Sequence, residues 1–384
     1  MANPYGPAFL VLNCHTTGML RNRVMENNAE NCEMIDLTKL NYKKNQHYVS
    51  RFYLDQWLVN KRFFVKRKEF DSFKVFDKQT AKEVGTERYF YGIEVDDDVL
   101  DTLKYMFGEQ SLSSKVLEKH LQDLTLLKLM DDAINKEIGI VNRNEALLEN
   151  VKSAFKHMTL HHLEDNYERI ETAISAEIKK FANSDFDESW YKPTHKTAMF
   201  IFVLFGTQLF RTKEKMIELR RLLPKIHIDR NGRKKTLTAE QKDSVLKVMA
   251  FFHALEFSAS LEKSGCTLTI TRNHTDLGYL TSDSPSLMHM NPPPELDLLA
   301  YGAIPLSPRV MAHIHFPKVK GNTNVLTVHD VHDVDQILLA NKVIISNPHS
   351  QLYASKLADF VRSGVDIGDY VEPAEKADRN NQSR

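Results

Sequence analysis

Residues 267–272 read Thr-Leu-Thr-Ile-Thr-Arg, and polar and apolar side chains alternate there without a break. A period of two is typical of a β-strand, because successive side chains of a strand point to opposite faces of a sheet. Residues 98–261 instead repeat apolar side chains every three or four positions, as amphipathic helices do. The change at Gly265 therefore separates a helical middle, 98–261, from a C-terminal strand-rich part, 265–365.

Short strands are also predicted on both sides of the helical middle. Phe63–Val65 and Phe73–Phe76 are apolar runs bounded by polar turns, which indicate antiparallel strands. Residues 277–281 are expected to pair with 267–272 as a hairpin. Further strands are expected at 303–305, 310–316, 325–328 and 343–346, and helices at 196–223, 334–341 and 351–362. We expect strands from both ends of the chain to share one sheet around the helices, so the fold class is α+β.

The length of 384 residues allows two domains or one large one. We expect an N-terminal extension over residues 1–45 and a single α+β domain over 46–365. Residues 370–384 are charged and polar, which predicts a disordered tail.

Charge and cysteine content exclude several classes of protein. The chain has 51 Lys and Arg against 51 Asp and Glu, so it lacks an overall basic field for nucleic acid, although a local patch remains open. Three cysteines without a Cys-x-x-Cys pair argue against a disulfide scaffold or a thiolate zinc site. No apolar run is long enough for a membrane helix, and the N-terminus lacks the pattern of a signal peptide. We therefore expect a cytoplasmic protein without a membrane partner.

Four short blocks stand out along the chain. They are Gln-His-Tyr-Val-Ser-Arg-Phe-Tyr-Leu at 46–54, Gln-Leu-Phe-Arg-Thr at 208–212, Thr-Ser-Asp-Ser-Pro at 281–285 and Pro-Leu-Ser-Pro at 305–308. In this order and spacing they resemble a bacterial family catalogued as domain of unknown function 4238. One departure is Ser50, where the family usually has proline, and we expect it to loosen a turn without touching a reactive group. The resemblance implies a domain boundary and special positions, and it implies no particular reaction.

The first block contains His47 and Arg51, which share a face if the segment is extended. Histidine can act as an acid or base near neutral pH, and arginine can hold a phosphate or carboxylate with two hydrogen bonds. The alternative is that both residues are buried and tie a terminal strand to the helices.

Gln208 and Arg211 lie three residues apart on an otherwise apolar helix, so they face the same side. A buried arginine needs an anionic partner, and we expect Asp283 or a bound anion. Asp283 follows a strand, where it either opens toward a cleft or caps the next turn. We expect one site made of His47, Arg51, Gln208, Arg211 and Asp283.

Two histidine patterns are candidates for metal binding. His157 and His161 are four apart on a helix, and His313 and His315 alternate on a strand. The helical pair lacks the glutamate of a metalloprotease, so we expect a solvated helix face there and predict no metal ligand. The chain also lacks the glycine-rich phosphate loops and the Gly-x-Ser-x-Gly elbow, which excludes kinase, dinucleotide-binding and ordinary serine-hydrolase classes. We predict no cofactor.

Two basic segments are candidates for nucleic-acid binding. One contains Phe63 and Phe64 between cations, a combination that can hold both phosphates and bases. The other is an expected basic turn or loop at 229–235. The predicted contact residues are Arg67, Lys68, Arg230, Arg233, Lys234 and Lys235. In a neutral protein such segments are often only solvated surface.

The favoured hypothesis is a metal-independent hydrolase or transferase acting on a phosphate-containing substrate, with RNA preferred, in the manner of a bacterial toxin or defence effector. His47 would be the acid or base, Arg51 and Arg211 would stabilise phosphate charge, Gln208 would orient the substrate, and Asp283 would orient His47 or act as a second acid or base. One alternative is a non-catalytic module that binds or senses a small anionic ligand. Another is a scaffold in which these residues form a buried polar network.

Overall fold

The protein is described by a computed structural model that covers residues 45–69, 72–111, 115–135, 145–182, 193–222, 227–230, 233–290, 292, 298–318, 325–347, 350–368 and 370. Contacts divide the chain into two compact units. The first is Met1–Lys43, Tyr91–Ile170 and His227–Val245, and the second is Lys44–Phe90, Glu171–Ile226 and Leu246–Arg384. The predicted extension and tail lie almost wholly outside the described residues, and the single domain over 46–365 stays a prediction.

The first unit is mainly helical, as the apolar repeat predicts. Leu103, Leu121 and Leu163 from this repeat are buried. The basic segment 229–235 is expected as a turn or loop, and its described residues 229–230 and 233–235 lie on two paired antiparallel strands. The elements are α3 (Asp97–Ser111), α4 (Lys115–Asn135), the first part of α5 (Glu145–Ala182), β5 (His227–Arg230), β6 (Arg233–Thr236) and the start of α8 (Ala239–Lys263).

The helix α8 begins at a reciprocal cap. The backbone N–H of Gln241 donates to Thr238 Oγ1 (3.1 Å), and the N–H of Thr238 donates to Gln241 Oε1 (2.9 Å). Among the described helices, α8 alone is long and apolar enough to cross a membrane. However, 61% of its most apolar window is buried within the protein, as is usual for a core helix.

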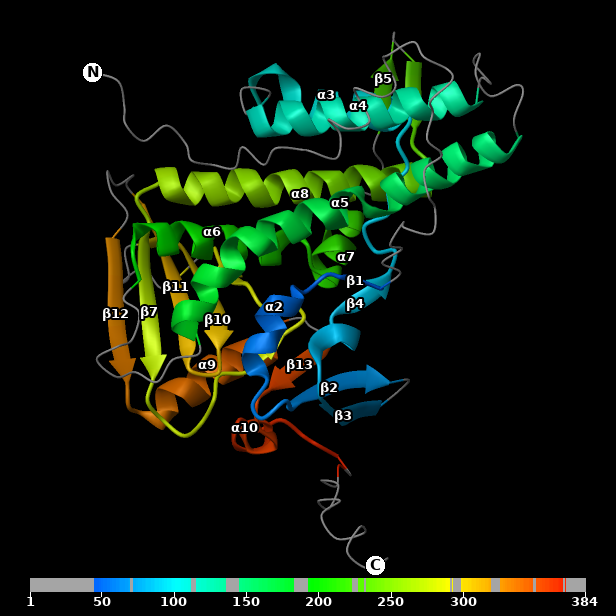
Figure 1. The fold of residues 1–384 in the computed structure, drawn as a ribbon. Helices are drawn as coiled ribbons and strands as arrows, with labels where there is room; N and C mark the ends of the chain where they lie inside the picture. Colours follow the sequence, from blue (N-terminus) through cyan, green and yellow to red (C-terminus); the bar gives the residue numbers. More distant parts are fainter. Residues whose placement is uncertain are drawn as a thin grey trace, which may run out of the picture. The chain divides into compact units, whose positions relative to one another are not determined.

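The second unit contains a five-stranded sheet (Figure 1). The segment that predicts a strand, 267–272, lies inside this sheet as β7, which pairs antiparallel with β11 and parallel with β12. One face is apolar and includes the buried Leu268 and Ile270. The strand order is β12 (Val325–Val331), β7 (Thr267–Asn273), β11 (Val310–Pro317), β10 (Leu298–Ser307) and β9 (Leu287–His289).

The helix α6 (His195–Phe210) packs closely against this sheet. A Cβ on Gly302 of β10 would lie 2.7 Å from the Phe205 ring of α6, so only glycine allows this approach. Because α6 is fixed on the sheet in this way, the position of its C-terminal end, where Gln208 and Arg211 lie, is fixed as well.

A four-stranded antiparallel sheet joins the two ends of the chain, as predicted (Figure 1). Its order is β3 (Ser72–Lys78), β2 (Phe63–Glu69), β13 (Gln351–Ala354) and β8 (Thr281–Ser282). Phe64, Val75 and Leu352 from three of these strands lie in one buried core. The helices α9 (Val334–Ser346) and α10 (Leu357–Arg362) contribute Ile337, Ile344 and Phe360 to that core.

Three details of the sequence-based assignment in the C-terminal part of this unit are wrong. Residues 343–346 continue α9 because Ile337, Asn341 and Ile344 share its buried side, which outweighs the strand preference of β-branched residues. Residues 277–281 do not form the hairpin partner of β7, because β7 pairs with β11 and β12 while Thr281 pairs with β13. Residues 351–362 divide into β13 and α10.

The expected single helix over 196–223 is two helices, α6 and α7 (Lys213–Leu222), separated at Arg211 and Thr212. The hydroxyl of Thr212 accepts a hydrogen bond from the backbone N–H of Lys215 (3.4 Å), as a residue at a helix start does. Because of this break, Gln208 lies on α6 and Glu214 lies on α7.

Candidate functional site

The segment from His47 to Arg51 changes direction instead of staying extended. The short strand β1 (Asn45–His47) ends at His47, and the one-turn helix α2 (Arg51–Leu54) begins at Arg51. The backbone N–H of Tyr48 donates to the carbonyl of Gly85 (2.9 Å), a residue with a φ of 61° that favours glycine. The turn at 48–50 therefore presents successive residues to two different polar clusters.

Arg211 is the centre of the first cluster and is only 1% exposed. Its Nη1 donates to the carboxylate of Glu171 and to Ser50 Oγ (3.2 Å), and its Nη2 donates to the carbonyl of His47. We call Arg211, Glu171, Ser50, Gln208 and His47 the Arg211 clamp. The expected partner of Arg211 was Asp283 or a bound anion, whereas the structure pairs it with Glu171 from α5.

Ser50 links the members of the Arg211 clamp. Its hydroxyl accepts from Gln208 Nε2 (2.5 Å) and donates to Glu171 Oε1 (2.8 Å). The expectation that Ser50 touches no reactive group is therefore wrong, because its oxygen lies between an amide, a guanidinium and a carboxylate. A proline at this position would supply the turn but no hydroxyl for these three groups.

His47 is held in its neutral form at pH 7. Burial, followed by the positive charges of Arg211 and Arg51, lowers the pKa of His47 to about 4. The side chain of Arg51 is 54% exposed and lies 3.8 Å from Asp55, a surface pair. The structure thus brings His47, Arg51, Gln208 and Arg211 together, but in an arrangement in which the buried guanidinium already has protein partners.

Asp283 belongs to a second cluster, and it is fully buried. Its Oδ1 accepts from the backbone N–H of Ser350 (3.0 Å), and its Oδ2 accepts from the Ser350 hydroxyl. The backbone N–H of Asp283 donates to the carbonyl of Gln351 (3.1 Å), so the pairing of β8 with β13 continues to this residue. We call Asp283, Glu214, Tyr48, Ser350 and Gln351 the Asp283 cluster.

Two phenols, those of Tyr48 in this cluster and of the neighbouring Tyr353, are hydrogen-bonded to Gln351. The side-chain amide of Gln351 donates to Tyr48 Oη (3.1 Å) and accepts from Tyr353 Oη (3.0 Å). Burial, and after it the charge of Asp283, raises the pKa of Tyr48 and of Tyr353 far above 10. Both phenols therefore stay protonated at neutral pH and act as hydrogen-bonding groups.

Glu214 is the group that sequence reasoning missed. It is the second residue of α7, and burial followed by the charge of Asp283 raises its pKa to about 7. Its Oε2 is buried and has no hydrogen-bond partner in the described part of the chain. In the sequence Glu214 stands between Lys213 and Lys215, a pattern typical of a solvated first helical turn. Its one distinguishing signal is its position three residues after Arg211.

The residues predicted to bind nucleic acid lie in both units. Arg67 is half-buried on β2, and its guanidinium lies 4.5 Å from the centre of the Phe76 ring. Lys235 donates a hydrogen bond to the carboxylate of Asp98. The expected platforms Phe63 and Phe64 are buried and unable to stack on a base. The side chains of Lys68, Arg230, Arg233 and Lys234 lie outside what the structure describes.

The histidine patterns do not assemble a ligand set. Among the described residues, no group of three or more His, Cys, Asp or Glu side chains is placed to hold a metal ion. His157 and His161 lie with ring centres 4.4 Å apart. His313 is hydrogen-bonded to Tyr301 and to Thr271 Oγ1 (3.1 Å). These rings are packed within the fold.

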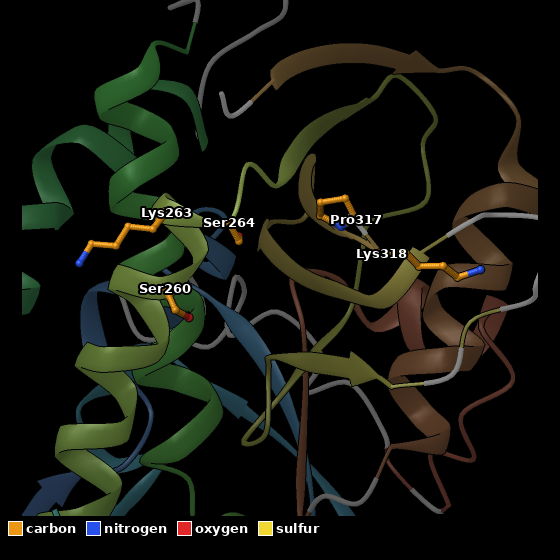
Figure 2. Close-up of a pocket in the computed structure, with 5 residues that line it drawn as sticks. All are labelled: Ser260, Lys263, Ser264, Pro317 and Lys318. Carbon is orange, nitrogen blue, oxygen red and sulfur yellow. The ribbon is translucent and has the colours of Figure 1, made fainter. Parts of the chain in front are cut away.

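A shallow depression of about 380 Å³ is lined by residues that belong to neither cluster (Figure 2). The side chains of Lys263 and Lys318 extend from it in opposite directions. None of the predicted catalytic residues and none of the members of the Asp283 cluster lines it. The lining residues are Ser260, Lys263, Ser264, Pro317 and Lys318.

The structure is that of an α+β protein with two buried polar clusters. Their members come from residues between His47 and Gln351. Residues 45–357 match the model of the family described as "Protein of unknown function (DUF4238)", so the chain belongs to this family. The match begins at β1 and ends at the first residue of α10, and it includes every residue of both clusters. No curated protein and no solved structure matches the chain.

Proposed function

We propose that the protein is a metal-independent hydrolase or transferase that acts on a phosphate-containing substrate, with RNA favoured and with Glu214 as its acid–base group. The observation that carries the proposal is the pKa of Glu214, which burial and the neighbouring Asp283 raise to about 7. A group that titrates near the working pH is the most effective proton carrier in catalysis.

Glu214 replaces His47 in the acid–base role for a physical reason. With a pKa of about 4, the imidazole of His47 is neutral at pH 7 and is too weak a base to take and hold a proton there. Glu214 instead populates both of its forms near pH 7, and its buried Oε2 has no hydrogen-bond partner among the described residues. After burial, Asp283 is the next cause of the raised pKa of Glu214, and the two oxygens of Asp283 accept from the backbone N–H and the hydroxyl of Ser350.

In the proposed step, the ionised Glu214 takes a proton from the attacking hydroxyl of water or of an acceptor. The oxygen–phosphorus bond to the nucleophile forms while the bond from phosphorus to the leaving oxygen breaks. Protonated Glu214 then returns the proton to the leaving oxygen, so that hydrolysis consumes one water and regenerates the carboxylate. Such an activity on RNA would suit a cytoplasmic toxin or defence effector.

The test is a cleavage assay with purified wild type and Glu214→Gln. Each protein is incubated with labelled tRNA, single-stranded RNA, and single- and double-stranded DNA, with and without EDTA. We expect wild type to cleave RNA with or without EDTA, and Glu214→Gln to lose about 10²–10⁴-fold in rate. The matched control is Glu218→Gln on the same helix, which loses only a surface pair with Lys215 (2.8 Å) and keeps the wild-type rate.

Equal rates for wild type and Glu214→Gln would overturn the assignment. Loss of cleavage in EDTA would overturn the metal-independent mechanism. Absence of cleavage in every reaction would overturn the enzymatic function and favour the binding module for an anionic ligand.

A further inference from the structure

We propose that single-stranded RNA docks on one face of the β2–β3 hairpin, with a base stacked on Arg67 and phosphates held by Lys74 and Lys78. The proposal rests on the proposed function, because it names the surface that leads the substrate to the Asp283 cluster. It differs from the sequence-based expectation, which placed the stacking on Phe63 and Phe64.

The strand register places Lys74 and Arg67 in line with two members of the Asp283 cluster. Lys74 of β3 pairs with Arg67 of β2, and Arg67 pairs with Gln351 of β13. The backbone bond from Asp283 to Gln351 (3.1 Å) extends the same row by one further residue. Residues directly opposite one another in antiparallel strands carry their side chains on the same face. Lys74, Arg67, Gln351 and Asp283 therefore form one row across the sheet.

The part of the row that solvent reaches, from Lys74 to Gln351, is short enough for a single nucleic-acid segment to cover, whereas Asp283 itself is fully buried. Neighbouring strands lie about 5 Å apart, so the backbones of Arg67 and Asp283, two strands apart, are separated by about 10 Å. A strand that places one phosphate at Lys74 is thereby directed toward Gln351, the residue of the row next to the buried Asp283. Gln351, between them, bonds Tyr48 (3.1 Å), which joins the row to the rest of the cluster.

The face also offers a stacking platform beside its charges. The guanidinium of Arg67 lies 4.5 Å from the centre of the Phe76 ring, and the ammonium of Lys78 lies 5.9 Å from it. Bases in single-stranded RNA stack on guanidinium planes and aromatic rings, whereas a duplex hides its base faces. The combination therefore favours a single strand over a duplex.

An edge strand often carries lysines only to prevent pairing with another sheet. That role explains the exposure of Lys74 on β3, but it requires neither a stacked Arg67–Phe76 pair nor alignment with Asp283. The two roles differ in a measurable way, since only docking makes affinity for RNA depend on these side chains.

The test measures fluorescence anisotropy of labelled single-stranded RNA with the full chain carrying Glu214→Gln, so that no substrate is consumed. We expect the added double change Lys74→Ala with Lys78→Ala, which removes both proposed phosphate contacts, to weaken binding at least tenfold. Removing two phosphate contacts should also make the slope of log K against log salt shallower by about 1.4. The control Lys263→Ala with Lys318→Ala removes the same charge beside the depression in Figure 2 and should change affinity by less than twofold.

Two further variants protect the test against folding failure. Lys74→Glu alters one exposed side chain and should weaken binding about tenfold on a chain with wild-type thermal unfolding. Phe76→Leu removes the ring while keeping an apolar side chain, and it should weaken binding to single strands severalfold without changing the salt slope.

Equal losses in the hairpin and control variants would overturn the docking surface. Equally tight binding of duplex and single-stranded RNA would also overturn it. So would binding to phosphatidylserine vesicles, and not to RNA, that is lost in the β2–β3 hairpin variants. Failure of the proposed function looks different: wild type would bind RNA through the hairpin and never cleave it. If cleavage instead required Glu214 while hairpin variants bound and cleaved normally, the docking surface alone would be wrong.

Discussion

The Arg211 clamp and the Asp283 cluster each contain a residue at or just after the break between α6 and α7, Arg211 in the first and Glu214 in the second. They differ in the charge that surrounds this residue. In the clamp, the guanidinium of Arg211 contacts Glu171, Ser50 and the His47 carbonyl. In the cluster, Glu214 lies near Asp283, a like charge, and has a pKa raised to about 7.

This difference distinguishes buried polar residues that stabilise the fold from those suited to proton transfer. A buried charge matched by an opposite charge makes the fold depend on both partners, because removal of one leaves the other uncompensated. A carboxyl group kept close to half ionisation is costly to the fold and suited to proton transfer. We therefore expect substitutions in the clamp to act on stability, and those at Glu214 to act on activity and on pH dependence.

The largest effect on stability is expected from Arg211→Met. The change leaves the carboxylate of Glu171 near the hydroxyl of Ser50 without its cation, and breaking a buried pair in this way costs about 3–5 kcal/mol. Urea unfolding followed by circular dichroism measures the loss. A free energy of unfolding within about 0.5 kcal/mol of wild type would show that the clamp does not support the fold.

A smaller loss is expected from Ser50→Ala. The substitution removes the oxygen that accepts from Gln208 (2.5 Å) and Arg211 (3.2 Å), and leaving buried donors without an acceptor costs about 1–3 kcal/mol. The same unfolding experiment, with Ser346→Ala as an exposed serine control, measures it. If both alanine variants unfold alike, Ser50 is not the link between the members of the clamp.

Glu214→Gln is expected to change how stability depends on pH. The pKa of Glu214 is raised from an ordinary 4.5 to about 7, so its protonated form stabilises the fold below pH 4.5 and this contribution is lost as pH rises through 7. Wild type should therefore lose stability relative to Glu214→Gln between pH 4.5 and 7, by on the order of 1 kcal/mol because solvent partly screens the carboxyl. Unfolding temperatures recorded across this range give the difference. Parallel pH curves for the two proteins would contradict the raised pKa.

The smallest effect is expected from Arg51→Ala. Arg51 forms only a surface pair with Asp55 (3.8 Å), and such pairs contribute less than about 1 kcal/mol. A change in stability within about 0.5 kcal/mol, measured beside Arg211→Met, would confirm that the two arginines differ in role. A loss as large as that of Arg211→Met would place Arg51 in the clamp.

The sequence predicts the fold where local pattern and tertiary packing agree. The alternation at 267–272 marks β7, and the apolar runs near Phe64 and Val75 mark strands that join the C-terminal sheet. It fails at 343–346, where β-branched residues indicate a strand but the buried side of α9 continues. Local preference is weak at such positions, and contacts with distant residues decide the structure.

The site is harder to predict because its members meet through packing alone. The four blocks point to His47, Gln208, Arg211 and Asp283, but Arg211, at the break between α6 and α7, pairs with Glu171 of α5, 40 positions away. No sequence period encodes that contact. Glu214 is hidden for a related reason, because its raised pKa arises from burial and from Asp283, which a helix start of Lys-Glu-Lys does not reveal.

The most direct test of the central claim is a titration of Glu214 by nuclear magnetic resonance. Protein labelled with ¹³C at glutamate carboxyl carbons is titrated from pH 4 to 9, and the Glu214→Gln spectrum identifies the resonance of Glu214. We expect this carboxyl to titrate near pH 7, above the other glutamates, and to move toward lower pH in Asp283→Asn. A midpoint near 4.5 would contradict the account, because Glu214 would then be an ordinary surface carboxylate and not the proton carrier of the site.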